Sequence, residues 1–277
     1  MIRSIVLFVV VFIGISSALN NLFKPAAKGG AVKGKKVVVL GGNGFVGSRI
    51  SQTLAESGNR VVAISRSGTI PSWCKDYDFV NNVEWASADV NDAVALQKVL
   101  KGASSVISAI GAIGFDEDRL IEGNGKANVA AIEASKKCGV PKFVYVSVAS
   151  QVKDTLGDKV LKPYFVGKDM AESALQKNYP GSKGTIVGPS FIYGGDSFTL
   201  TPPRVPGGYG SFIANLLSSP AIRKLAEVSP APIALVLAPP VSVESVAAAS
   251  SASALGKTNA AIIDGTDEII GAAELLE

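Results

Sequence analysis

The stretch that decides the fold is VVVLGGNGFVGSRI, residues 37–50, in which an apolar run precedes four glycines within seven positions. The run VVVL is typical of a strand buried on both faces of a sheet. Glycine is costly inside regular structure, so the cluster indicates a place where the backbone must approach something closely. Val46, Ile50 and Leu54 then recur at intervals of four, which predicts a helix that ends at Gly58.

The glycines fit the spacing G-x-x-G-x-x-G between a strand and a helix. In that setting they permit a tight turn, and the N–H groups of the first helical turn can bind a pyrophosphate. A glycine-rich turn without a ligand is the alternative. We assign cofactor binding to six residues of this segment: Gly41, Asn43, Gly44, Phe45, Val46 and Gly47.

Strand-like and helix-like segments alternate along the rest of the chain. Strands are predicted at 36–40, 60–65, 83–90, 104–111, 142–150, 184–194 and 260–265, with helices between most of them. This alternation predicts an α/β fold, a Rossmann-type doubly wound parallel sheet of about seven strands over residues 36–277. Eight of the 14 prolines fall between residues 202 and 240, which predicts a small C-terminal lid around 195–245, with a short helix near 211–219.

Composition excludes several classes of site. The 277 residues include no histidine, so Ser-His-Asp hydrolysis and a histidine-ligated zinc site are excluded, and we expect no metal. The two cysteines, Cys74 and Cys138, indicate no disulfide framework. The net charge is +4, but six of the 27 basic residues lie within residues 1–36, which hold no acidic residue. The other 21 basic and 23 acidic residues form a slightly acidic body, which argues against a nucleic-acid partner.

The N-terminus has the features of a targeting segment. Arg3 precedes the apolar run IVLFVVVFIGI, residues 5–15, and small residues follow at the spacing of a cleavage site after Ala18. The run is shorter than the ~20 residues that span a bilayer. Residues 19–35 are basic and resemble a transit peptide, so the two parts together resemble plastid targeting in algae with secondary plastids, where Leu19 would follow the cleavage point. Mitochondrial import, secretion and a membrane anchor are the alternatives.

The residues after the second, third and fourth strands predict the cofactor. Arg66, flanked by serines and with no carboxylate nearby, suits a 2′-phosphate, so NADP(H) is favoured over NAD(H). A solvated loop arginine is the alternative. Four further cofactor contacts are predicted: Asp89 and Val90 at the adenine, and Ala109 and Gly111 where the fourth strand passes under the cofactor.

The ordered motifs resemble the short-chain dehydrogenase/reductase superfamily. They are GGNGFVG, ADV, NGKANV, FVYVS, YFVGK and GPSFIYG, and the resemblance covers about residues 36–270. The chain is most similar to atypical members, namely plant organellar NAD(P)-binding Rossmann proteins, the fungal coenzyme-Q biosynthesis member and the NADPH-binding accessory subunit of respiratory complex I. The resemblance implies an NAD(P)-binding fold and either oxidoreductase activity or a role in an organellar complex.

In that superfamily a Tyr-x-x-x-Lys pair supplies the acid, which the resemblance carries onto Tyr164 and Lys168. The tyrosine gives its proton to a substrate carbonyl, while the lysine lowers the tyrosine pKa and holds the cofactor ribose. A second match, Tyr179 to Lys183, encloses a proline and a glycine, so its ends cannot share a helix face. Tyr164 and Lys168 lie four residues apart in a predicted helix and can meet.

The superfamily also places a serine or threonine after the fifth strand, where the candidates are Ser147 and Ser150. We select Ser147, because Ala149 stands at the position that aligns with the catalytic serine of sugar-nucleotide epimerases. Gly188 replaces the arginine that relatives usually have, and Pro189 is expected near the nicotinamide.

These observations predict an NAD(P)H-dependent oxidoreductase that transfers hydride to a small apolar or quinone-like carbonyl. One alternative is a non-catalytic NADPH-binding structural or assembly subunit of a membrane-associated organellar complex, of the complex I or coenzyme-Q biosynthesis type. Another is a sugar-nucleotide epimerase or dehydratase, which Ala149 and a C-terminal part of only ~80 residues disfavour.

Overall fold

The structure is a computed structural model that describes residues 34–114, 116–156, 162–195, 199–200, 203–204, 206–230, 233–234 and 237–276. The chain divides into two units, Met1–Val32 and Lys33–Glu277, and the second is described below. The predicted leader, 1–18, and nearly all of the predicted linker, 19–35, lie outside the described residues. Within the described ranges, no helix combines the length and the apolar character needed to cross a membrane.

A seven-stranded parallel sheet forms the centre of the second unit. Its strands are β1 (Lys36–Leu40), β2 (Arg60–Ser65), β3 (Val83–Ser87), β4 (Ser105–Ser108), β5 (Phe143–Val146), β6 (Gly184–Gly188) and β11 (Ile262–Asp264). They lie in the order β11, β6, β5, β4, β1, β2, β3, and every pairing is parallel. Parallel neighbours need crossover connections, and this order makes the sheet doubly wound. The predicted fold class is confirmed.

Side chains of β1 point alternately into two cores. Val37 and Val39 pack in one core, and Val38 and Leu40 pack in the other. All four are completely buried. A strand covered on both faces has no polar side, which explains the unbroken apolar run in the sequence.

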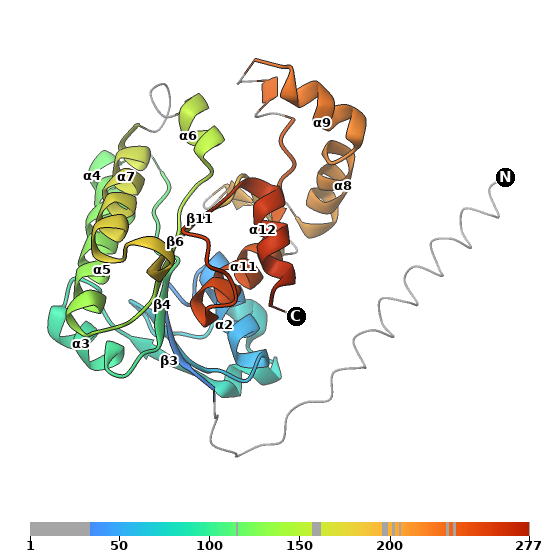
Figure 1. Cartoon of the computed structure of the whole chain (residues 1–277). Helices are drawn as coiled ribbons and strands as arrows, with labels where there is room; N and C mark the ends of the chain where they lie inside the picture. Colours follow the sequence, from blue (N-terminus) through green and yellow to red (C-terminus); the bar gives the residue numbers. More distant parts are fainter. Residues whose placement is uncertain are drawn as a thin grey trace. The chain divides into compact units, whose positions relative to one another are not determined.

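Helices cover both faces of the sheet (Figure 1). On one face lie α2 (Phe45–Glu56), α11 (Val243–Leu255) and α12 (Gly265–Glu274), and on the other lie α3 (Ala93–Leu100), α5 (Ala127–Lys137) and α7 (Lys162–Asn178). A short helix, α4 (Glu117–Ile121), continues through the π-helical turn η3 (Glu122–Lys126) into α5. Neither α4 nor η3 was predicted from the sequence.

Several strands end earlier than the sequence predicts. β3, β4 and β5 end at Ser87, Ser108 and Val146, where the pattern suggested residues 90, 111 and 150. The residues beyond these ends form loops at the carboxyl edge of the sheet, and a helix that was not predicted, α6 (Ser150–Leu156), follows β5.

The predicted sixth strand, 184–194, is two strands. β6 stops at Gly188, and β7 (Ile192–Tyr193) pairs with β10 (Val241–Ser242) in a separate small sheet. Pro189 follows β6 directly, and a proline has no N–H group with which to continue the hydrogen-bonded ladder.

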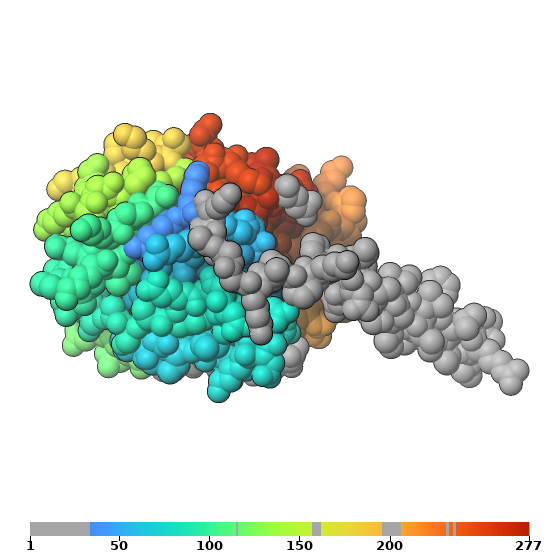
Figure 2. Space-filling view, turned by 90° about the horizontal axis from the view of Figure 1, so that it is seen from below, coloured from blue at the N-terminus to red at the C-terminus, as the bar shows by residue number. Residues whose placement is uncertain are grey.

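The proline-rich stretch contains helices α8 (Gly207–Leu217) and α9 (Pro220–Glu227), together with a small hairpin of β8 (Thr199–Leu200) and β9 (Pro203–Arg204). The helix predicted near 211–219 is therefore present but begins earlier. An ion pair between Arg223 and Asp267 joins α9 to α12, and in Figure 2 the orange atoms of this stretch border the red C-terminal atoms. That the stretch covers a substrate stays a prediction.

Candidate functional site

The carboxyl ends of the parallel strands lie at one edge of the sheet. From β1 the chain winds outward through β2 to β3, and from β4 it winds in the other direction through β5 and β6 to β11. The winding direction therefore switches between β1 and β4, and ligands of doubly wound sheets bind at this crevice. Apart from Lys168, which lies on α7, the cofactor and serine residues predicted from the sequence lie just after the ends of β1 to β6, so the structure brings them to the carboxyl ends of the strands.

Close backbone packing requires glycine in the loop after β1. A Cβ atom on Gly47 would lie 2.2 Å from the Gly41 carbonyl oxygen, and one on Gly41 would lie 2.9 Å from the Ala109 oxygen. Gly41 also has a φ of +78°, which favours glycine. A Cβ atom on a third glycine, Gly42, would lie only 2.7 Å from the Ala63 side chain. These glycines let α2 begin directly against the ends of β1 and β4.

The start of α2 is electrostatically suited to an anion. Gly44 is its N-cap residue, and no side chain caps the helix there. The first turn, which contains Phe45, Val46 and Gly47, has no acidic residue. The partial positive charge of a helix N-terminus is therefore not offset by a local carboxylate.

Asn43 joins the glycine loop to the loop after β2. Its Nδ2 atom donates a hydrogen bond to Ser67 Oγ at 3.0 Å, and the Ser67 and Thr69 hydroxyl groups are 2.8 Å apart. The Arg66 side chain is exposed, while its carbonyl oxygen accepts a hydrogen bond of 2.8 Å from Ser87 Oγ. Arg66 belongs to none of the ion pairs found in the described part of the chain. Arg66 thus directly precedes Ser67, a member of this cluster of polar side chains.

Four further cofactor candidates lie in the loops that follow β3 and β4. Asp89 is exposed and accepts a hydrogen bond of 2.9 Å from the Asn91 N–H group, while Val90 is half-buried. Ala109 is half-buried and Gly111 is exposed in the loop after β4.

Two buried asparagines hold the β4 loop. Asn124 Nδ2 donates to the Ala112 oxygen at 2.8 Å, and its Oδ1 accepts from the Ala112 N–H group at 3.1 Å. Asn128 Oδ1 accepts from Ser108 Oγ at 2.6 Å, and its Nδ2 donates to the Ile110 oxygen at 3.3 Å. The sequence motif NGKAN marked these residues only as part of a resemblance, and their role in fixing the loop was missed.

Lys168 lies in the packing between α7 and β5. Its side chain is only 4% exposed, and Nζ donates to the Val146 oxygen at 3.1 Å. The same nitrogen lies 4.9 Å from the centre of the Tyr145 ring and 5.6 Å from that of Tyr164. Tyr164 and Lys168 therefore meet one turn apart on the face of α7 that packs against the end of β5.

Burial changes the acidity of both side chains. Loss of solvent raises the pKa of Tyr164 to about 12, and the Glu172 carboxylate adds to that rise. Loss of solvent lowers the pKa of Lys168 to about 8, and Glu172 opposes that fall. Burial and the Glu172 carboxylate thus shift the pKa of Tyr164 in the direction opposite to the lowering that the resemblance implies.

Ser147 shares the site with an acidic residue that sequence reasoning missed. Ser147 Oγ donates a hydrogen bond of 2.5 Å to Glu172 Oε1. Glu172 Oε2 lies 4.0 Å from Lys153 Nζ, and Lys153 also pairs with Asp169. Glu172 follows Lys168 by four residues on α7, and that spacing was the signal that could have found it.

The other serine candidate, Ser150, has a different environment. It begins α6, where its N–H group donates to Asp264 Oδ1 at 3.0 Å and its hydroxyl donates to the other oxygen of that carboxylate. A Cβ on Gly188 would lie 2.7 Å from Asp264 Oδ1 and 3.0 Å from the Val148 carbonyl oxygen, so a side chain at this position would be crowded. Ala149 is buried, and its N–H group donates to the oxygen of the buried Pro189 at 2.9 Å.

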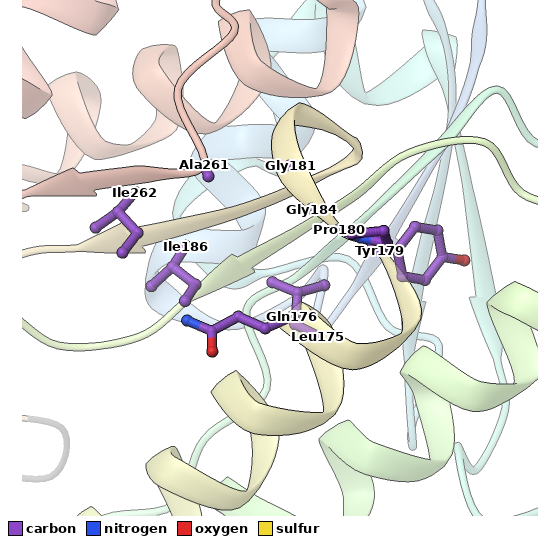
Figure 3. A pocket seen from close by; sticks show the side chains of 9 residues that line it. All are labelled: Leu175, Gln176, Tyr179, Pro180, Gly181, Gly184, Ile186, Ala261 and Ile262. Atoms are coloured by element: carbon purple, nitrogen blue, oxygen red, sulfur yellow. The ribbon is translucent and has the colours of Figure 1, made fainter.

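The second Tyr-x-x-x-Lys match lies at the other end of the strands, near the amino end of β6. Tyr179 is buried just after α7, and Lys183 ends the turn η4 (Gly181–Lys183) that leads into the amino end of β6. Tyr179 also lines a cavity of about 180 Å³ between the end of α7, β6 and β11 (Figure 3). Neither the pair nor the cavity lies beside the glycine loop.

Comparisons with known proteins agree with this geometry. A family described as NAD(P)H-binding matches residues 41–205. An uncharacterized chloroplastic protein of Arabidopsis thaliana is 38% identical over 220 residues, which cover 79% of this chain and 71% of that protein. MIOREX complex component 2 of Saccharomyces cerevisiae is 28% identical over 63% of this chain and 62% of its own length. Ceramide reductase of Caulobacter vibrioides is 30% identical over 59% of this chain but only 49% of its own length.

Solved structures share the fold. A UDP-N-acetylglucosamine 4-epimerase of Methanobrevibacter ruminantium has a TM-score of 0.59 at 20% identity, covering 84% of this chain and 76% of its own. At that identity the likeness concerns the fold alone. The family match extends over more than half of the chain, and the Arabidopsis relative is similar over most of both proteins. On these grounds the chain belongs to the NAD(P)H-binding Rossmann family, with the short-chain dehydrogenase/reductase type of fold.

Proposed function

We propose that this chain is an NADPH-dependent reductase that acts on an uncharged apolar or quinone-like carbonyl. The observation that carries the proposal is the meeting of Tyr164 and Lys168 on one face of α7, against the end of β5. This proposed acid and its cationic neighbour lie at the carboxyl ends of the strands, on the same side of the sheet as the glycine loop.

The chain's own residues suit a dinucleotide phosphate. Side chains at Gly41 and Gly47 would fill the space that the backbone of the loop needs, and no carboxylate offsets the start of α2. Arg66, with Ser67 and Asn43 beside it, suits the 2′-phosphate that distinguishes NADPH from NADH. When bound, NADPH supplies the hydride that the carbonyl carbon accepts.

Tyr164 and Lys168 divide the proton chemistry between them. With a pKa of about 12, Tyr164 keeps its proton at neutral pH and can give it to the carbonyl oxygen, which gains an electron pair as the carbon gains hydride. With a pKa of about 8, Lys168 is mostly charged at pH 7 and stabilises the phenolate that Tyr164 becomes.

The charges around Ser147 favour an uncharged substrate. Lys153 is already paired with Asp169 and lies near Glu172, so it offers little attraction to a substrate phosphate or carboxylate. The proline-rich stretch exposes large apolar side chains, among them Tyr209, Phe212 and Leu216. The name of the Caulobacter relative, ceramide reductase, also supports reduction of an apolar carbonyl.

The test is NADPH consumption with menadione and a panel of aryl ketones. Wild type should oxidise NADPH, and Tyr164→Phe should lose at least about a hundredfold in kcat, as expected for removal of a general acid. NADPH binding by the variant, measured by tryptophan quenching, should stay within about threefold. Equal turnover by both proteins would contradict the assignment of Tyr164.

A second candidate function is a cofactor-binding structural subunit. One observation favours it: the Ser147 hydroxyl already donates to Glu172 and is not free to donate to a carbonyl. A relative that is a component of the MIOREX complex also supports membership of a complex. Tight NADPH binding by wild type without turnover of any carbonyl tested would favour this candidate.

We also propose plastid localisation through residues 1–35. The composition of this segment supports it, and so does the chloroplastic name of the Arabidopsis relative.

A further inference from the structure

A serine hydroxyl has one proton, and in this structure the proton of Ser147 is already engaged. Ser147 is 5% exposed, and its Oγ donates to Glu172 Oε1 at 2.5 Å. A hydroxyl that donates to an ionised carboxylate keeps only its lone pairs for other partners. Toward the rest of the site, Ser147 can therefore accept a hydrogen bond but cannot donate one.

The surrounding charges hold the carboxylate in this orientation. Glu172 Oε2 lies 4.0 Å from Lys153 Nζ on α6, so its two oxygens have different neighbours, a cation and a hydroxyl. The other titratable groups around Glu172 are Tyr145 on β5 and Tyr164, Lys168 and Asp169 on α7.

Ser147 is also close to the proposed acid. Lys168 Nζ donates to the oxygen of Val146, the residue before Ser147, and Lys168 lies beside the Tyr164 ring. Glu172, which accepts the Ser147 hydrogen bond, is also close enough to Tyr164 to raise its pKa, so the proposed acid and the Ser147–Glu172 pair share one part of the site.

We propose that Ser147 and Glu172 form an acceptor site that selects carbonyl substrates with a hydroxyl or amide N–H group beside the carbonyl. Glu172 acts as a positioning residue, because it sets the direction of the Ser147 hydroxyl without contacting the substrate. The predicted effect on turnover rests on the proposed reductase function. The direction of the hydrogen bond between Ser147 and Glu172 does not depend on that function.

Glu172→Gln reverses the hydrogen bond. Lys153 attracts the amide oxygen of Gln, so the amide nitrogen faces Ser147 and donates to its Oγ. The hydroxyl proton of Ser147 is then free. Crystal structures of wild type and of the variant should show this contact lengthen from the ~2.5–2.7 Å of an O–H···O⁻ bond to the ~2.9 Å of an N–H···O bond. A contact that stays short would overturn the proposed direction.

The kinetic test uses phenacyl alcohol and 2-methoxyacetophenone. Beside the carbonyl, the first has a hydroxyl that can donate a hydrogen bond, and the second has an ether oxygen that can only accept one. Wild type should prefer phenacyl alcohol by about tenfold or more in kcat/KM. Glu172→Gln and Ser147→Ala should each remove most of that preference, and combining them should remove no more. Ser147→Ala should lose the preference because phenacyl alcohol reacts more slowly, and Glu172→Gln because the freed Ser147 proton lets 2-methoxyacetophenone react faster. A purely structural defect would lower both rates together.

Two results separate the possible failures. If neither wild type nor any variant reduces either ketone, the proposed function fails. The distance between Ser147 and residue 172 in the crystal structures still tests the direction of the hydrogen bond. If wild type reduces both ketones equally, the acceptor site is wrong while the reductase stands. Should Glu172→Gln not fold, Glu172→Asp shortens the side chain and withdraws the carboxylate from Ser147, with the same expected loss of preference.

Discussion

At the scale of single residues, Lys168 is the charged side chain most completely removed from water in the described part of the chain. Its ammonium group is held by one carbonyl oxygen and two aromatic rings in the interior of the protein. A charged group in such a place lowers the stability of the fold. A protein keeps such a group where its function needs it. The Lys168 pKa of about 8 gives this cost a pH dependence.

The free energy of unfolding should rise with pH above about pH 8 because of Lys168. Between its folded pKa of about 8 and its ordinary value of 10.5, the unfolded chain binds the proton and the folded chain does not. Stability therefore increases with pH through that window. Urea unfolding on both sides of pH 8 should show the rise in wild type and not in Lys168→Met, while the exposed-lysine control Lys137→Met should keep it.

Arg66 should determine which dinucleotide is preferred. Arg66→Ala is expected to cost NADPH binding ~1.5–3 kcal/mol, the worth of one charge-assisted hydrogen bond, and to leave NADH binding nearly unchanged. Arg60→Ala, at the opposite end of the same strand, is the matched control and should affect neither. Equal losses for both dinucleotides in Arg66→Ala would refute the preference.

At the scale of elements, the contact between the glycine loop and α2 decides the geometry of the crevice. The helix can start against β1 only because the position facing the Gly41 oxygen has no side chain. The buried asparagines of η3 and α5 fix the loop on the other side of the crevice. Two elements from distant parts of the chain thus form its walls.

Gly47→Ala should separate α2 from the loop. The new Cβ would lie 2.2 Å from the Gly41 oxygen, so backbone must move. We expect a loss of about 1–3 kcal/mol of stability and of measurable NADPH binding. Gly271→Ala is the control, because nothing lies within 4 Å of its added Cβ in α12. That variant should be as stable as wild type or up to ~1 kcal/mol more stable, with unchanged binding.

The sequence predicts features whose residues are close together in the chain and misses contacts between residues that are far apart in it. The β1 strand, the glycine loop and α2 are adjacent in the chain, and the Tyr164 and Lys168 spacing lies within one helix, so patterns of a few residues suffice. The Ser147 to Glu172 bond joins residues 25 positions apart, and Ser150 and Asp264 are 114 apart. Nothing local distinguishes these partners from other acidic residues, since only the packing of α7 and β11 against β5 and β6 brings them together.

At the scale of the whole molecule, the second unit contains the complete sheet and both helical layers, while the predicted targeting information lies in residues 1–35. The two functions should therefore be separable. Fused to a fluorescent protein in an alga with a secondary plastid, residues 1–35 should direct it to the plastid, because both parts of the signal are present. Residues 19–35 alone should leave it in the cytosol. Secretion of the longer fusion would contradict plastid targeting.

The central claim is that a dinucleotide binds across the start of α2. Isothermal titration of the purified full-length chain with NADPH, and separately with NADH, tests it most directly. We predict saturable binding at one site per chain, tighter for NADPH than for NADH. A correctly folded protein that gives no binding signal with either dinucleotide would contradict the claim.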